Sequence, residues 1–144
     1  MIRINQDPNQ NIYVTLTENK VGTSEYYLME CTNQVTNDIS YCILLKDASQ
    51  YKERFNKFVM SLDTNNQFKG LNESFYFPYT GFYTYVIFET TLTEAQYLNL
   101  TDAEQASNST LGQLETGLLW YIPTAQNNTE YNPTDSTTYV YTPQ

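Results

Sequence analysis

The chain has 144 residues, a net charge of −9 and no histidine, and only 16 % of its residues are charged. Its length is that of one domain. Seven scattered basic residues argue against partners with a phosphate backbone, so we expect neither specific nucleic-acid binding nor binding to an anionic membrane.

The composition favours strands over helices. Asn, Thr, Gln and Ser supply most of the polarity, and there are 14 tyrosines. Aromatic and β-branched side chains suit a pleated surface. No apolar run reaches the roughly 20 residues that cross a bilayer. The opening stretch MIRINQDPNQ has no apolar segment typical of a secretory signal, so we expect synthesis in a cytoplasm.

Strands are predicted along the first third of the chain, separated by turn signals such as Asp7-Pro8-Asn9 and Gly22. The expected ranges are 2–5 as a short edge strand, 11–17, 24–32 and 39–46.

The two cysteines lie in a predicted hairpin. A tight turn at Thr36-Asn37 would place Cys31 opposite Cys42. Counting outward from the turn makes them a hydrogen-bonded pair, the more widely spaced kind. Because cytoplasmic synthesis also favours thiols, we expect two small buried hydrophobic residues rather than a disulfide.

The middle of the chain continues this pattern. Strands are predicted over 57–62 and 73–77, the second ended by Pro78. Between them, residues 63–70 read as a hairpin loop. A calcium loop is rejected there, because Lys69 occupies a ligand position and Ser74 stands where a bidentate Glu belongs.

The strand predicted over 82–89 is aromatic or apolar on both faces. One face carries Phe82, Thr84, Val86 and Phe88, and the other carries Tyr83, Tyr85, Ile87 and Glu89. A sandwich core takes only one face, so the other needs a cover, either a loop of the same chain or another subunit. We expect the surplus face to be the one near Tyr83 and Tyr85.

Residues 90–110 predict an irregular excursion with a turn or two of helix. Thr93 to Gln96 and Thr101 to Glu104 both have the sequence of a capping box. A strand is predicted over 114–122, with Gly117 as a bulge or a close approach. A last strand over 137–142 would dock on this subunit or on the next one.

These elements predict an all-β fold. We expect a single antiparallel β-sandwich of immunoglobulin-like or jelly-roll type over residues 1–126, with a long loop and an extended C-terminal tail over 127–144.

Catalysis is not indicated. Histidine, a glycine-rich phosphate loop and a nucleophile elbow are all absent. Glu89 and Glu115 would neighbour each other if their strands pair, as glycoside hydrolysis requires, but solvated strand ends explain them equally. We expect no enzyme activity, no cofactor and no metal. Sugar binding by Trp120, Tyr121 and the Tyr83/Tyr85 face is the stronger rival to an aromatic protein interface.

Three segments carry a family resemblance: SEYYLMECTNQVTNDISYCI, SQYKERFNKFVMSL, and GFYTYVIFE followed at a distance by LETGLLWYI. Their most specific elements are Tyr51-x-x-Arg54-Phe55-Asn56-x-Phe58, Gly81-Phe82-Tyr83-x-Tyr85 and Glu115-x-Gly117. The chain resembles, over roughly residues 24–122, small virion proteins of tailed phages that infect Bacteroidetes-type hosts, including crAss-like phages.

The resemblance implies a non-enzymatic virion protein repeated in a head–tail connector or tail ring. Capsid decoration and a carbohydrate-binding, receptor-recognising module are the alternatives. Its partners would be copies of itself and other virion proteins. Arg54 would either cover Phe55 or Phe58 or form a salt bridge that locks a loop or a neighbouring subunit. The expected interface residues are Tyr83, Tyr85, Arg54, Trp120, Tyr139 and Tyr141.

Overall fold

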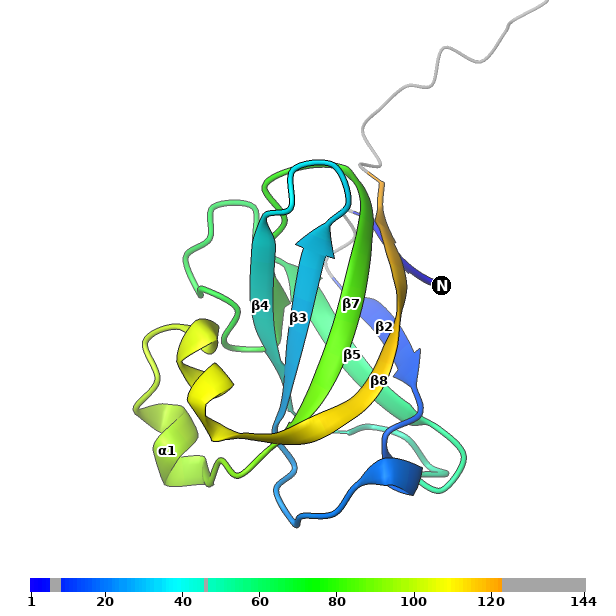
Figure 1. Ribbon diagram of the computed structural model, residues 1–144, viewed down its shortest axis with the longest axis vertical. Coiled ribbons are helices and arrows are strands. Elements are labelled where there is room, and N and C mark those ends of the chain that lie inside the picture. The colour runs from blue at the N-terminus through cyan, green and yellow to red at the C-terminus, as the bar shows by residue number, and fades with distance from the viewer. Residues whose placement is uncertain (6–8, 46, 123–144) are drawn as a thin grey trace, which may run out of the picture.

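A computed structural model describes residues 1–5, 9–45 and 47–122 (Figure 1). The expected C-terminal tail, its strand over 137–142, and the candidate interface residues Tyr139 and Tyr141 lie outside the described residues.

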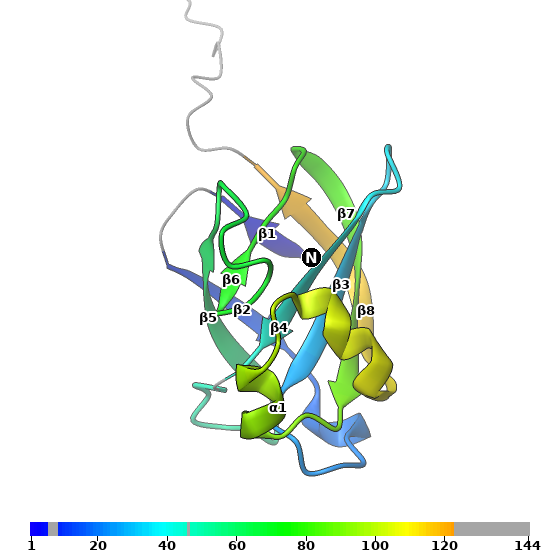
Figure 2. The same ribbon diagram turned by 90° about the vertical axis from the view of Figure 1, so that its left-hand side faces the viewer.

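The described chain is all-β and forms two sheets (Figure 1). The larger sheet has the strand order β1-β8-β7-β3-β4, with bounds Ile2–Ile4, Thr110–Tyr121, Gly81–Thr90, Tyr27–Asn33 and Ile39–Leu44. The smaller sheet has the order β2-β5-β6, with bounds Gln10–Val14, Asn56–Leu62 and Ser74–Phe75. Figure 2 shows β2 and β5 in one layer and β3, β7 and β8 in the other.

Two strand pairs differ from the uniformly antiparallel expectation. β1 pairs with β8 in parallel, and β5 pairs with β6 in parallel. The segment 63–70 is therefore not a hairpin loop. It crosses to the edge of the other sheet, where the carbonyl of Gly70 accepts a hydrogen bond from Ile43 N at 2.9 Å. Gly70 has φ +79°, and an added Cβ would lie 2.1 Å from the carbonyl oxygen of Tyr41, so this approach requires glycine.

The core between the sheets takes the inward face of every long strand. In β7 this face is Tyr83, Tyr85, Ile87 and Glu89, each no more than 5 % exposed. The expectation that Tyr83 and Tyr85 form the surplus contact face is therefore wrong. The outward face is the alternate set that begins at Phe82.

The β3–β4 hairpin has a different register from the one expected. Cys31 pairs with Ser40, and Cys42 pairs with Met29. The side chain of Asn33 explains the shift, because its Oδ1 accepts hydrogen bonds from Val35 N and Thr36 N and so organises a longer loop. Both cysteines are free and buried, as expected.

The excursion between β7 and β8 covers part of the outer face of the larger sheet. It contains helix α1, Glu94–Leu98, and the 3-10 helix η2, Ala103–Ser109. The expected capping box at Thr93 and Gln96 is present. The second box is not, because Asp102 rather than Thr101 caps η2.

Ala103, Ala106 and Leu92 of this excursion pack on Leu28 of β3 and Ile43 of β4, on the side of the sheet away from β2 and β5 (Figure 2). The sequence left two possible covers for the outer face of the sheet, a loop of the same chain or another subunit. Over β3 and β4 the cover is a loop of the same chain. The outer face of β7 and β8 near Phe82 is not part of this cluster.

Candidate interaction surface

A row of aromatic and cationic side chains crosses the outer face of the larger sheet. Arg3, Trp120 and Phe82 are direct neighbours on β1, β8 and β7. The Phe82 and Trp120 rings stack with centroids 5.3 Å apart and planes 15° apart, and the Arg3 guanidinium carbon lies 5.7 Å from the Trp120 ring centroid. We call this row, with the adjacent pair Leu118 and Thr84, the platform.

The platform is apolar and solvent-exposed. Phe82 and Leu118 are each 45 % exposed, and Trp120 is partly exposed. Polar groups border it, since the Gln34 side-chain amide donates to the Thr84 hydroxyl at 3.3 Å. An exposed ring pair flanked by a cation suits contact with another protein surface or with a sugar ring.

Tyr83 and Tyr85 cannot belong to this surface. The Tyr83 hydroxyl donates to the carbonyl of Tyr79 at 2.5 Å, and the Tyr85 hydroxyl donates to Glu115 Oε1 at 2.6 Å. Burial raises the pKa of both phenols, and for Tyr85 the hydrogen bond to the Glu115 carboxylate raises it further. Both rings serve the core.

Arg54 is exposed in the connection between β4 and β5. Phe58, one of its two expected stacking partners, is fully buried, and Phe55 packs edge-on against Tyr13 with ring centroids 5.8 Å apart. Arg54 has no ion-pair partner in the part of the chain that the structure describes. Of the four expected interface residues that the structure describes, Trp120 on β8 and Arg54 in the β4–β5 connection lie at the surface.

Glu89 and Glu115, weighed as a catalytic pair, instead hold one backbone segment. Glu89 is 1 % exposed and accepts hydrogen bonds from Val21 N, at 3.0 Å, and from Gly22 N. Glu115 Oε2 accepts from Thr15 N at 2.6 Å. These carboxylates fix the start and the middle of the β2–β3 connection, and hydrogen bonds to backbone amides account for their inward placement.

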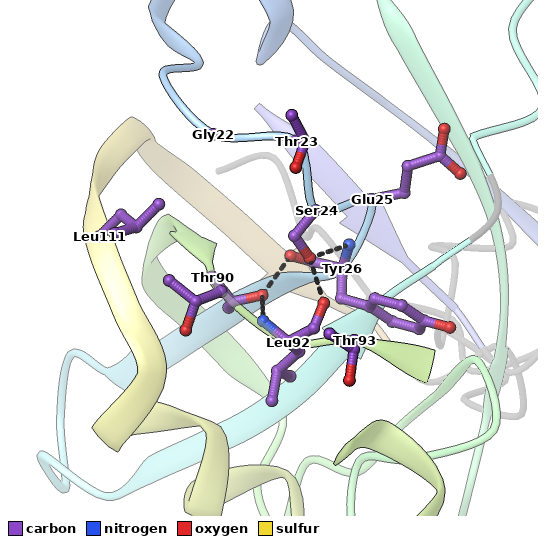
Figure 3. A pocket seen from close by; sticks show the side chains of 10 residues that line it. Gly22, Thr23, Ser24, Glu25, Tyr26, Thr90, Leu92, Thr93 and Leu111 are labelled. Atoms are coloured by element: carbon purple, nitrogen blue, oxygen red, sulfur yellow. Dashed lines mark hydrogen bonds between the residues drawn. The ribbon is translucent and has the colours of Figure 1, made fainter. Parts of the chain in front are cut away.

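A hollow of about 450 Å³ lies between the start of the excursion that links β7 to β8 and the segment before β3 (Figure 3). At its centre the Ser24 hydroxyl donates to Leu92 O at 2.7 Å and accepts from Tyr26 N at 3.2 Å. Leu111 and Glu25 lie on opposite sides of it. Because the Ser24 hydroxyl donates to a backbone carbonyl, which is not a base that could take its proton, these bonds join two segments and do not activate a nucleophile.

In the described ranges, no group of three or more His, Cys, Asp or Glu side chains could hold a metal ion. In the same ranges, no helix has the length and apolar character needed to cross a membrane.

Comparison of the chain with protein-family models, curated proteins and solved structures finds no match.

Sequence reasoning found Trp120 but missed Phe82, Arg3 and Leu118. The available signal was the spacing of Leu118 and Trp120, which share one face of a strand. That spacing did not say which face points outward, because Leu119 and Tyr121 are equally apolar.

Proposed function

We propose that the chain is a non-enzymatic structural subunit of a tailed-phage particle, repeated in a head–tail connector or tail ring. The observation that carries the proposal is the platform. There the stacked rings of Phe82, which is exposed, and Trp120, which is partly exposed, lie outside the half of the sheet that the excursion covers. Aromatic residues and Arg are enriched in the cores of protein interfaces.

Two further features support an assembly role over catalysis. The carboxylates that could have formed an acid–base pair are bound to backbone amides. The net charge of −9 suits a surface near packaged DNA that must not bind it. The resemblance noted above supplies the particle type.

The test is the oligomeric state of the full chain, measured by sedimentation velocity over a wide concentration range, with electron microscopy of any assembled species. We expect oligomers or rings, and a weaker association after Phe82→Ser. Val35→Ser is the matched control, since Val35 is 87 % exposed at the β3–β4 loop and outside the platform. A chain that remains monomeric at all concentrations contradicts the proposal.

A second candidate, carbohydrate binding, is favoured by the near-parallel rings of Phe82 and Trp120 and the polar groups of Arg3, Gln34 and Thr84 around them. A glycan array with the wild-type chain and Phe82→Ser separates the two functions. Binding to a defined glycan that is lost in the variant, by a chain that stays monomeric, favours the second.

A further inference from the structure

A groove of about 370 Å³ opens beside α1, at a distance along the sheet from the platform. Its wall is the stacked pair Tyr26 and Tyr97, with ring centroids 5.0 Å apart and planes 23° apart. Leu98, which is 72 % exposed, and the carboxylate of Glu94 also line it. An aromatic wall, an aliphatic side chain and an acid make a site suited to an arginine or lysine carried next to an apolar residue.

The groove has a fixed shape. The capping box of α1 sets the position of Glu94 in the first turn and of Tyr97 one turn later. The Tyr97 hydroxyl accepts a hydrogen bond from Asn72 N at 3.0 Å, which ties α1 to the loop before β6. Tyr26 is held by the bond from its own amide to Ser24. A preformed site loses less conformational entropy on binding.

The groove is also negatively charged. Glu73 and Glu94 line it, and no Lys or Arg is among its described lining residues. Burial raises the pKa of the Tyr26 phenol, and the charges of Glu94 and Glu25 raise it further. A cation entering the groove therefore meets a favourable potential.

The complementary element lies in the connection between β4 and β5. Residues 51–54, Tyr-Lys-Glu-Arg, form a tight turn in which Arg54 N and Phe55 N both donate to the carbonyl of Tyr51, at 2.9 and 3.1 Å. Tyr51 is 63 % exposed, and Lys52 and Arg54 are exposed beside it. This turn, which we call the basic turn, presents an aromatic ring and two of the chain's seven basic residues together. Glu53 is exposed between them, so Lys52 and Arg54 minus Glu53 leave the turn a net charge of +1.

The base of the basic turn is rigidly anchored. Asp47 Oδ1 accepts hydrogen bonds from Ser49 N at 2.9 Å and from Lys57 N at 3.0 Å, and Oδ2 accepts from the Asn56 side chain at 2.6 Å. The turn therefore projects from the start of β5 as a preformed element.

We propose that the basic turn of one copy docks in the Tyr26–Tyr97 groove of the next copy, with the Arg54 guanidinium facing the Glu94 carboxylate and Tyr51 packing on Tyr97 and Leu98. This inference rests on the proposed function, and names one contact through which the subunits join. Charge complementarity between the two elements selects a second copy as the occupant.

The geometry sets the type of assembly. The basic turn leads into the smaller sheet, and the groove lies over the excursion on the larger one. Two different surfaces in contact make a head-to-tail interface, which closes into a ring or extends as a filament. The platform, on β1, β8 and β7, is then a second and separate contact surface.

The experiment uses two charge reversals in the full chain, Arg54→Glu and Glu94→Arg, both at exposed positions, with folding checked by circular dichroism. Each variant alone places like charges across the interface, so we expect association at least about tenfold weaker for both. They shift the net charge of −9 in opposite directions, so a general charge effect would weaken one and strengthen the other.

Restored association is the decisive readout. The double variant regains opposite charges across each contact, and so does an equimolar mixture of the two single variants, in alternating order. Glu104→Arg, an equal charge change on the same excursion but outside the groove, is the control and should associate like the wild type.

The outcomes are separable. Assembly of the wild type with unchanged association of Arg54→Glu, or weakening without rescue, overturns the docking contact and leaves the proposed function standing. A wild-type chain that never associates overturns both.

Discussion

The Tyr85 ring lies over Gly117, its direct partner across the β7–β8 pair, while its hydroxyl donates to Glu115 at 2.6 Å. A Cβ added to Gly117 would lie 2.8 Å from the Tyr85 hydroxyl and 2.9 Å from two ring carbons. This close approach, not a bulge, is the reason for glycine at position 117. The register shifts between β7 and β8 occur further along, beyond Ile87.

Gly117→Ala should therefore destabilise the fold, by about 1–3 kcal/mol, because Tyr85 is pinned by the core and by Glu115 and cannot move aside. Gly112→Ala in the same strand is the control, since a Cβ there meets nothing within 4 Å. Urea unfolding of the two variants measures the difference. Equal midpoints would contradict the packing argument.

Glu89→Gln should cost on the order of 2 kcal/mol of unfolding free energy, because it replaces a charged acceptor of two backbone amides with a neutral group that also carries donors. Hydrogen exchange at the Gly22 amide should become faster in the variant. Glu53→Gln, at an exposed position in the basic turn, should change stability by less than about 0.5 kcal/mol. An unchanged exchange rate at Gly22 would show that the Glu89 bond does not hold this segment.

Asp47 should make the β4–β5 connection sensitive to acid. Burial acts to raise the pKa of this carboxyl, but hydrogen bonds from Ser49, Lys57 and Asn56 outweigh it and the net pKa is lowered. A lowered folded-state pKa gives stability that is present above the unfolded value of about 3.9 and is lost as the pH falls through the folded value.

The measurement is amide exchange of Lys57, followed by NMR from pH 6 downward. Protection should fall below about pH 4 in the wild type and should be low at every pH in Asp47→Ala. Protection that persists at low pH in the wild type would mean that the charged form of Asp47 does not hold the connection.

The thiols of Cys31 and Cys42 should be unreactive in the native protein. Burial raises the pKa of both, and the neighbouring charge of Glu30 contributes for Cys31, so the thiolate is scarce as well as inaccessible. Labelling with an aromatic disulfide reagent should be absent in buffer and reach two thiols per chain in denaturant. Rapid labelling of the folded chain would contradict the burial.

β7 could be predicted as a strand because its run of β-branched and aromatic residues is long. Which face points inward could not, because both faces are apolar enough to be buried. Contacts distant in sequence decide it: Gly117 leaves room for the Tyr85 ring, and the amides of Val21 and Gly22 accommodate the carboxylate of Glu89. Neither contact has a local sequence signature.

The surface was predicted in part. The sequence suggested Trp120 and Arg54 as interface residues, and both lie at the surface. The residues that surround Trp120, and those that form the groove, depend on contacts between distant segments. Arg3 reaches Trp120 only because β1 lies parallel to β8, and Tyr26 meets Tyr97 only because the excursion folds back over β3. Parallel pairing of short strands far apart in the chain is not visible in local patterns.

That parallel pairing also has a consequence for how the molecule is made. Ile2 and Ile4 are buried against a strand that is synthesised almost last among the described elements, with Ile122 N donating to Ile4 O at 2.8 Å. β1 can therefore complete its pairing only after β8 has been synthesised. Contacts this distant in sequence raise the contact order, and a high contact order slows folding.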